Sequence, residues 1–352
     1  MRLSLKFTIT LFICIFTLLT IVMNSCRVDP EILPVVNKED VKFYVPVGFP
    51  QPVYTFQNNT VTPEGFALGR KLFYDNRLSM NNAISCGNCH QQFVAFANAE
   101  HQFSHGYDGG YGTRNAPALF NLAWNQLFMW DGGINHIENQ PLGPIQNPIE
   151  MNETISNVIA KLNAVPSYHT DFEKAFGSDS ITTQRICRAL AQFMGVMISA
   201  DSKYDKYMRG ETSLTTSEEH GLALYRTKCA SCHTEPLFTD ESFHNNGLAV
   251  DNTINDYGRM HITLNPADSL KFKTPSLRNV AVTGPYMHDG RFITLQECVD
   301  HYSSGIVQSS TLDPLLTAGI PLTPAEKTDL INFLTTLTDY TFMNDSKFSE
   351  IH

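Results

Sequence analysis

Two five-residue segments carry the most specific chemistry in this 352-residue sequence: residues 86–90 read CGNCH and residues 229–233 read CASCH. Thiols at positions i and i+3 lie on one face of a helical turn, where they can bond the two vinyl groups of a haem, and the adjacent histidine offers a ring nitrogen to the iron. The composition produces such a match by chance only roughly 0.006 times per chain. We therefore predict two covalently bound haem c groups, held by Cys86, Cys89, His90, Cys229, Cys232 and His233.

Paired cysteines have two other common uses, a redox-active Cys-x-x-Cys pair and a zinc site made by four cysteines. Neither use gives a reason for a histidine directly after both pairs. What two haems can do depends on the sixth position of each iron. If strong ligands fill both positions, the protein only transfers electrons, whereas an open position can bind a small oxidant such as peroxide.

The composition excludes several classes of protein. Hydrophobic residues make up 42% of the chain and charged residues only 17%, which is not the composition of a disordered protein. The net charge of −10 has the wrong sign for a protein that binds the phosphates of a nucleic acid. The length indicates about two domains.

The N-terminus resembles a secretory signal, because Arg2 and Lys6 precede a charge-free apolar run over residues 7–23. The following Ser25-Cys26 resembles a bacterial lipoprotein cleavage site. A lipid-anchored Cys26, simple cleavage and a retained anchor helix all remain open. Each of them exports the chain, so we expect a periplasmic or other cell-envelope location, with membrane contact only through a lipid on Cys26.

Helix signals precede both motifs and recur near the C-terminus. Thr62, Thr215 and Thr323 each begin a capped helix, and residues 181–198 have amphipathic spacing. Strand-like alternation is scarce, and the helices are separated by long loops, notably residues 98–149 and 234–290.

A helix followed by Cys-x-x-Cys-His occurs once in each half of the chain, which is a weak internal repeat. We therefore expect a mainly α fold of two cytochrome c-like haem domains packed together, with few strands. The predicted parts are a signal over residues 1–26, a Pro-rich linker or extended arm over 27–60, an N-terminal haem domain over 61–208 and a C-terminal haem domain over 209–352.

Several segments around both motifs resemble the bacterial dihaem cytochrome c peroxidases, a family that includes the dihaem enzyme that matures tryptophan tryptophylquinone. The resemblance covers roughly residues 60–340. Its segments are LFYDNRLSMNNAISCGNCH, SHGYDGGYGTRNAPALFN, MWDGG, NPIEMN, TPSLRNVAVTGPYMHDGRF and TLQECVDHY.

The resemblance implies three roles around the first haem. His105 matches the histidine that caps this haem in the resting enzyme, although a loop histidine can simply be a surface residue. Glu150 matches the acid–base residue of the peroxide site, although it can also be a solvated loop carboxylate. Trp130 matches a tryptophan that relays electrons between the haems, a role that is compatible with ordinary core packing.

The resemblance also implies an inter-domain calcium ion and contacts to the haem carboxylates. Asn115, Thr283 and Pro285 match the calcium site, where the ion takes one side-chain oxygen and backbone carbonyls. Arg114 and Arg278 are candidates to pair with haem propionates.

The second haem departs from the well-known peroxidases, in which a methionine is its sixth ligand. The matching position here is Tyr302, as in the tryptophylquinone-maturing branch. His301, Met287 or no protein ligand are the alternatives, and a buried hydrogen-bonded tyrosine is the plain interpretation of Tyr302. A phenolate stabilises ferric and higher states, whereas methionine raises the potential.

The leading hypothesis is thus a periplasmic dihaem peroxidase. It would reduce H2O2 to water with electrons that a small cytochrome c or cupredoxin passes through the C-terminal haem to the N-terminal haem. The alternatives are a high-valent dihaem oxidase that modifies a protein or organic substrate, and a dihaem electron carrier. A homodimer is among the arrangements that the sequence allows. Cys187 and Cys298 are left over, either as free thiols or as a disulfide.

Overall fold

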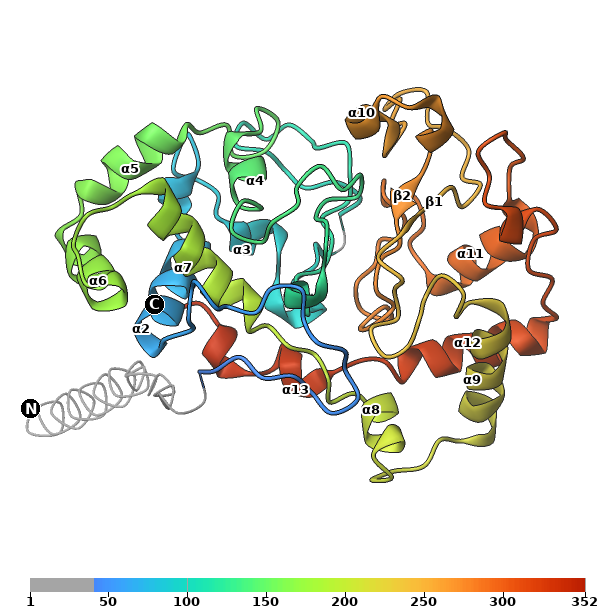
Figure 1. Ribbon diagram of the computed structural model, residues 1–352. Coiled ribbons are helices and arrows are strands. Elements are labelled where there is room, and N and C mark those ends of the chain that lie inside the picture. Colours follow the sequence, from blue (N-terminus) through green and yellow to red (C-terminus); the bar gives the residue numbers. More distant parts are fainter. Residues whose placement is uncertain (1–40, 100, 352) are drawn as a thin grey trace, which may run out of the picture. The chain divides into compact units, whose positions relative to one another are not determined.

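The computed structural model of this protein describes residues 41–99 and 101–351 (Figure 1). The predicted signal and Cys26 lie outside the described residues. The fold is mainly α, as predicted, with one two-stranded antiparallel sheet in which Phe243 pairs with Lys273. The elements are α2 Pro63–Phe73, α3 Cys86–Cys89, α4 Leu142–Gln146, α5 Ile155–Asn163, α6 Pro166–Phe176, α7 Thr183–Gly195, α8 Lys203–Met208, α9 Thr216–Lys228, β1 Phe243–His244, α10 Met260–Thr263, β2 Phe272–Lys273, α11 Leu295–Asp300, α12 Pro324–Thr335 and α13 Tyr340–Met343.

The predicted helix starts are confirmed. The Thr62 hydroxyl accepts a hydrogen bond from the Gly65 amide at the start of α2. Thr215 begins α9 and Thr323 begins α12, each with a reciprocal capping box. In such a box the threonine and the glutamate three residues later satisfy amides that the first helical turn leaves unpaired.

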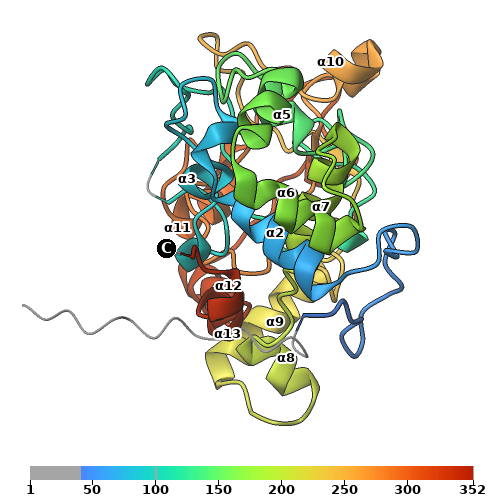
Figure 2. The same ribbon diagram turned by 90° about the vertical axis from the view of Figure 1, so that its left-hand side faces the viewer.

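Two helix pairs form the framework of the molecule, α2 with α7 and α9 with α12. Figure 2 shows α2 beside α7, with α6 next to them. Each pair crosses at a glycine. A Cβ atom on Gly69 would lie 2.0 Å from the Ala189 carbonyl oxygen, and one on Gly221 would lie 2.0 Å from the Asp329 carbonyl oxygen. We call the part around α2 and α7 the first lobe and the part around α9 and α12 the second lobe.

Each lobe has an aromatic core on its helix pair. In the first lobe, Phe66 and Phe73 of α2 pack against Phe193 of α7, with ring centroids 5.3 Å and 5.2 Å apart. In the second lobe, Tyr225 of α9 packs against Phe333 of α12 at 5.1 Å. Burial of aromatic surface of this kind is a main source of stability.

A buried polar network joins the two lobes. The Asn279 side-chain amide donates to the Ser199 hydroxyl (3.0 Å), which donates to the Asp339 carboxylate (3.1 Å). The Asn121 side-chain amide donates to the Ser199 carbonyl oxygen, and its side-chain oxygen accepts from the Ser199 backbone amide. Because every group is satisfied inside the protein, the network fixes one packing of the lobes.

Residues 41–60 form an extended segment without helices or strands that packs over Trp124. The Trp124 indole donates to the Pro50 carbonyl oxygen (2.8 Å), and the rings of Phe43 and Phe49 lie 5.6 Å and 5.3 Å from it. This segment therefore covers part of the first lobe.

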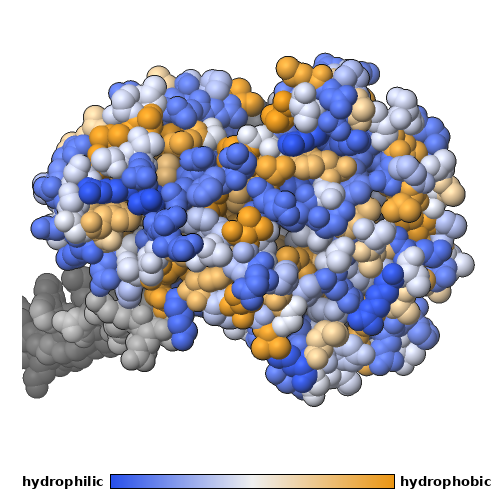
Figure 3. Space-filling model, viewed as in Figure 1, coloured by the Kyte–Doolittle hydropathy of each residue, from blue (hydrophilic) through white to orange (hydrophobic). Residues whose placement is uncertain are grey.

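In the part of the chain that the structure describes, no helix combines the length and the apolar composition that crossing a membrane requires. Figure 3 shows a mainly hydrophilic face with hydrophobic patches, some of them in the furrow between the two lobes.

Candidate functional site

The first Cys-x-x-Cys-His motif forms a short helical turn, α3. The Ser85 backbone amide donates to the Asn88 side chain (2.7 Å), which caps the turn, and the His90 amide donates to the Cys86 carbonyl oxygen (2.9 Å). Cys86 and Cys89 therefore lie on one side of a single turn, and both are free thiols. This is the local geometry that attachment of a haem through two thioethers requires.

The His90 ring is oriented by a backbone carbonyl. Its Nδ1 donates to the Phe96 carbonyl oxygen (2.9 Å), which leaves Nε2 available to a metal. Burial lowers the pKa of the His90 imidazole to about 4, although the hydrogen bond to the Phe96 carbonyl opposes this effect. His90 is therefore neutral at physiological pH, which is the form that binds iron.

A cavity of about 560 Å³ lies beside this turn. It is large enough for a cofactor, and its wall combines the motif with loops that follow it in the sequence. The predicted site residues that line the cavity are Cys86, Cys89, His90, His105, Arg114, Asn115, Trp130 and Glu150. The structure thus brings together all predicted residues of the first haem site.

The Glu150 carboxyl lies in this wall and has one side-chain partner. Asn147 donates to Glu150 Oε1 (2.9 Å). Burial raises the pKa of the Glu150 carboxyl above its ordinary value, and the Asn147 hydrogen bond works against that rise. A carboxyl with a raised pKa is suited to exchange protons in a buried site.

The loop that carries His105 is hydrogen-bonded to the backbone of Glu150. The Tyr107 amide donates to the Glu150 carbonyl oxygen (2.7 Å). Gly106 permits this approach, because a Cβ atom there would lie 2.4 Å from the Ile149 carbonyl oxygen. The His105 ring lies against Tyr111, with centroids 4.7 Å apart.

The second motif also forms a helical turn, at the end of α9. The His233 amide donates to the Cys229 carbonyl oxygen (3.0 Å), and Cys229 and Cys232 are free thiols. The His233 Nδ1 donates to the Phe238 carbonyl oxygen (3.2 Å), as His90 does in the first site. Burial lowers the pKa of His233, so its Nε2 is available to a metal.

Tyr302 lies within electrostatic range of Cys229 and Cys232, the two cysteines of the second motif. It belongs to a π-helical turn, His301–Gly305, that follows α11 directly, and such widened turns are frequent at functional sites. Burial raises the pKa of the Tyr302 hydroxyl to about 12, while the Asn246 side chain lowers it. Of the alternative ligands, His301 has its Nε2 bound to the Asn246 carbonyl oxygen (3.0 Å), and the Met287 sulfur contacts the Asn246 amide (3.4 Å).

Trp130 lies between the two lobes. It lines both the large cavity and a second cavity of about 170 Å³ that residues of the second lobe also line. Its indole donates to the Asn115 carbonyl oxygen (2.8 Å), and the Asn115 amide donates to the His288 carbonyl oxygen (2.8 Å). Trp130 is therefore connected to both lobes.

The three predicted calcium ligands, Asn115, Thr283 and Pro285, all line this second cavity. The Asn115 amide nitrogen donates to the Gln102 carbonyl oxygen (3.2 Å), which orients the other side-chain atom, Oδ1, as an acceptor. One side-chain oxygen and backbone carbonyls are oxygen ligands of the kind that calcium takes.

The two predicted propionate partners are both paired with protein carboxylates. Arg114 contacts Asp131 (2.6 Å) and Asp256 (2.6 Å). Arg278 is buried and forms two hydrogen bonds of 2.9 Å with Asp205. Arg114 lines the first cavity and Arg278 the second, and their contact with propionates stays a prediction.

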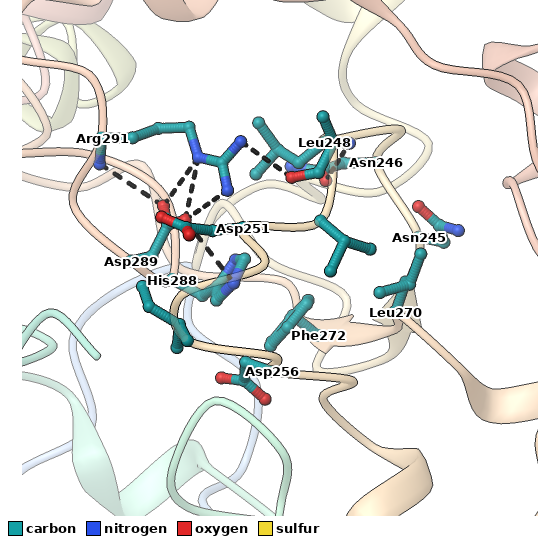
Figure 4. Close-up of a pocket in the computed structure, with 13 residues that line it drawn as sticks. Asn245, Asn246, Leu248, Asp251, Asp256, Leu270, Phe272, His288, Asp289 and Arg291 are labelled. Carbon is teal, nitrogen blue, oxygen red and sulfur yellow. Dashed lines mark hydrogen bonds and ion pairs between the residues drawn. The ribbon is translucent and has the colours of Figure 1, made fainter. Parts of the chain in front are cut away.

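The segment around His288 lines a further, small pocket (Figure 4). The His288 ring stacks on Phe272, with centroids 3.7 Å apart, and burial lowers its pKa to about 4. Figure 4 shows Arg291 directed at Asp289, so this ion pair fixes the loop. Cys187 and Cys298, elsewhere in the fold, are both free thiols.

Sequence reasoning missed a second repeat that the structure reveals. Phe128 bridges Ile134 in a loop of the first lobe, and Tyr286 bridges Phe292 in the corresponding loop of the second. Met129 and Met287 occupy the same place in these loops, with φ of 67° and 71°. The similar segments FMWDGG and YMHDGR were the available signal. Asn147 had none, because its role depends on a contact with Glu150 that the fold creates.

The arrangement fits two haem c groups. In both sites the motif presents two free thiols on one helical turn, and a backbone carbonyl holds the histidine in the tautomer that binds iron. A mainly helical protein with two such turns is a dihaem c-type cytochrome in its architecture.

Comparison with known proteins identifies the family. The sequence profile of the di-haem cytochrome c peroxidases matches residues 63–213. The methylamine utilization protein MauG of Methylorubrum extorquens is 35% identical over 306 residues, which are 84% of this chain and 83% of that protein. The cytochrome c551 peroxidase of Nitrosomonas europaea is 36% identical and covers 68% of this chain and 74% of its own length. This chain belongs to the di-haem cytochrome c peroxidase family, which includes MauG, and is an oxidoreductase.

Solved structures agree with this assignment. A MauG-like protein associated with microbial copper homeostasis matches with a TM-score of 0.81 and 35% identity, over 88% of this chain and 99% of that chain. The diheme peroxidase BthA from Burkholderia thailandensis matches 84% of this chain and 91% of its own length, with a TM-score of 0.70. At 23% identity, this match shows that the two proteins share the fold.

Proposed function

We propose that this protein is an exported dihaem peroxidase that reduces H2O2 to two waters with two electrons from a small redox partner. The observation that supports this most directly is that His90, His105 and Glu150 line one cavity beside the first motif. In this proposal His90 binds the iron, His105 is a cap that can leave it, and Glu150 exchanges protons, so the three roles meet in one cavity.

The proposed chemistry assigns Glu150 the proton transfer. When bound, the haems supply iron that takes up peroxide and electrons that break its O–O bond. In its ionised form, Glu150 would accept a proton from one peroxide oxygen and deliver it to the other, which would leave as water. Asn147 holds the carboxylate in place (2.9 Å). Two electrons and two further protons complete the reduction to two waters.

Electrons enter through the second haem in this proposal, and Trp130 relays them to the first. Trp130 supports this role because it lines cavities on both sides of the lobe boundary. The donor is a cytochrome c or cupredoxin, and calcium bound by Asn115, Thr283 and Pro285 holds the lobe boundary. We further propose haem domains over residues 61–208 and 209–352, a periplasmic or cell-envelope location, and attachment through a lipidated Cys26.

A second candidate function is a high-valent oxidase that modifies a protein or organic substrate. Tyr302 favours it, because this side chain lies within electrostatic range of Cys229 and Cys232. A tyrosine ligand would keep the potential of the second haem low, so that this haem would give up electrons to peroxide more readily than it would accept them from a donor.

One experiment separates these candidates from each other and from a plain electron carrier. The full-length holoprotein is mixed with peroxide and a reduced small cytochrome, before and after partial prereduction. The peroxidase hypothesis predicts oxidation of two donor equivalents per peroxide, and a loss of about 10²- to 10⁴-fold in rate for Glu150→Gln. Gln146→Leu, an exposed change on the neighbouring helix, is the matched control.

The other outcomes are equally specific. An oxidised species formed from the fully ferric protein and peroxide, without donor consumption, supports the oxidase instead. The electron carrier predicts no turnover and no binding of azide or cyanide in any redox state.

A further inference from the structure

A histidine on β1 has a carboxylate at each nitrogen of its ring. The His244 Nδ1 lies 2.6 Å from Asp313 Oδ2, and its Nε2 lies 2.9 Å from Asp240 Oδ2. An ionised carboxylate only accepts hydrogen bonds, so each ring nitrogen must carry a proton to donate to its partner. The geometry therefore places an imidazolium between two carboxylates, and the three side chains together carry one net negative charge. We call them the Asp–His–Asp cluster.

The backbone fixes both carboxylates of this cluster. Asp240 Oδ1 accepts from the Ser242 amide (2.9 Å), and Asp313 Oδ1 accepts from the Leu315 amide (2.8 Å). Each carboxylate thus uses one oxygen for a backbone amide and the other for His244. All three side chains are partly buried, with at most 24% of their surface exposed, so water screens their charges less than it would on the open surface.

The Asp–His–Asp cluster lies beside the second haem-binding motif. The Cys232 sulfur, an Asp240 carboxylate oxygen and a His244 ring nitrogen all lie within 4.8 Å of one another. Haem attachment makes this sulfur a thioether on the edge of the porphyrin, so the cluster is close to the bound group. The next charged residues on the same segments, Glu241 and Lys273, pair with each other (2.9 Å) and add no net charge.

A metal ion is the other use that a cysteine, an aspartate and a histidine at this distance suggest. That use needs the Cys232 thiolate as a ligand. In a di-haem c-type protein this sulfur is bonded to the haem, so the cluster acts through its charge instead.

The charge of a neighbouring group changes the reduction potential of a haem. Ferric haem carries one more positive charge than ferrous haem, so nearby negative charge stabilises the ferric state and lowers the potential, whereas positive charge raises it. We infer that the Asp–His–Asp cluster sets the reduction potential of the second haem. Its two carboxylates lower the potential, and the imidazolium of His244 limits that decrease. The inference requires only the two covalently bound haems, and it holds for a peroxidase and for an oxidase alike.

The test measures the potential of the second haem in the holoprotein by spectroelectrochemical titration. A pH of about 5.5 keeps a histidine beside even one carboxylate protonated. His244→Asn leaves two negative charges and should lower the potential. Asp240→Asn and Asp313→Asn each leave no net charge and should raise it.

The double variant His244→Asn/Asp313→Asn separates charge from structure. It leaves one negative charge, as in the wild type, so its potential should return close to the wild-type value. Damage to a purely structural cluster would instead accumulate in the double variant. Glu219→Gln is the control, because it removes an exposed carboxylate of α9 about 15 Å along that helix from Cys229, and it should leave the potential unchanged.

The inference is overturned if the single variants all shift the potential in one direction, if none shifts it, or if the double variant departs from the wild type further than either of its single variants. If His244→Asn fails to take up the second haem, the two aspartate variants still decide, because an unchanged or lowered potential in either contradicts the inference. The peroxide–donor assay is a separate test, because its outcome depends on Glu150 and the first haem.

Discussion

The Glu150 carboxyl experiences two opposing influences, burial that raises its pKa and the Asn147 hydrogen bond that lowers it. Only the ionised carboxylate can accept a proton from peroxide. Peroxide turnover should therefore decline as the pH falls through the pKa of Glu150, and the midpoint should lie above the ordinary value of 4.5.

Removing the Asn147 amide should move the acid decline of peroxide turnover to a higher pH. In Asn147→Leu the carboxylate loses its donor, so its pKa rises and the acid limb of the rate profile shifts to higher pH. The check is the pH dependence of the rate at low peroxide concentration, with Gln146→Leu as the control. An acid limb that stays in place in Asn147→Leu would argue against Glu150 as the titrating group.

At the scale of single residues, two histidines could be placed from the sequence and one asparagine could not. His90 and His233 follow their cysteines directly, so the motif places them. Asn147 acts only through Glu150, the partner that the fold brings to it, and asparagine is common in ordinary turns.

At the scale of elements, a glycine sets the distance in each helix pair. Gly69→Ala places a Cβ atom against the Ala189 carbonyl oxygen, which would lie only 2.0 Å away. The two helices must separate, so we expect a loss of about 1–3 kcal/mol in the free energy of unfolding. Gly221→Ala in the second lobe should behave similarly because its contact with Asp329 is equally close.

Denaturant unfolding followed by haem absorbance and by circular dichroism measures this effect. Ala67→Ser, an exposed change on α2, is the control and should alter stability little. Wild-type stability in Gly69→Ala would show that the helices can move apart freely and that the crossing is not tight.

The capped helices were predicted from short signals because caps depend on residues three positions apart, as at Thr215 and Thr323. The short α11 and the π-helical turn after it were not anticipated. The π-helical turn at His301–Gly305 leaves no pattern in the local sequence.

At the scale of the whole molecule, the second lobe completes the first cavity. Ile254 and Asp256 of the loop before α10, and His261 of α10 itself, line the cavity beside the first motif. Asp256 is connected to the first lobe through Arg114 (2.6 Å), which also contacts Asp131. This ion pair is partly buried, so it can hold the loop against the cavity.

Asp256→Asn should therefore loosen the loop and admit small ligands faster. We expect azide or cyanide to bind the first haem several-fold faster than in the wild type, as measured by stopped-flow absorbance. Asp268→Asn, in the same segment and paired with Lys271 (3.2 Å) outside the cavity, is the control. Equal binding rates in all three proteins would show that the Arg114–Asp256 pair does not limit access.

The sequence by itself determined what is local along the chain. The two haem-binding turns, the capped helices and the mainly α fold depend on contacts within about one helical turn, so neighbouring residues specify them. The resemblance to the dihaem peroxidases, which covers residues around both motifs, indicated the family that the comparisons then established.

Only the tertiary structure decided which distant residues share a site. Glu150 and His90 line one cavity although long loops and the short helix α4 separate them along the chain. Such residues come together because the packing of α2 on α7 and of α9 on α12 brings the two ends of each intervening loop near each other. Local sequence preferences do not determine this helix packing, because it depends on how buried surfaces from distant parts of the chain fit together.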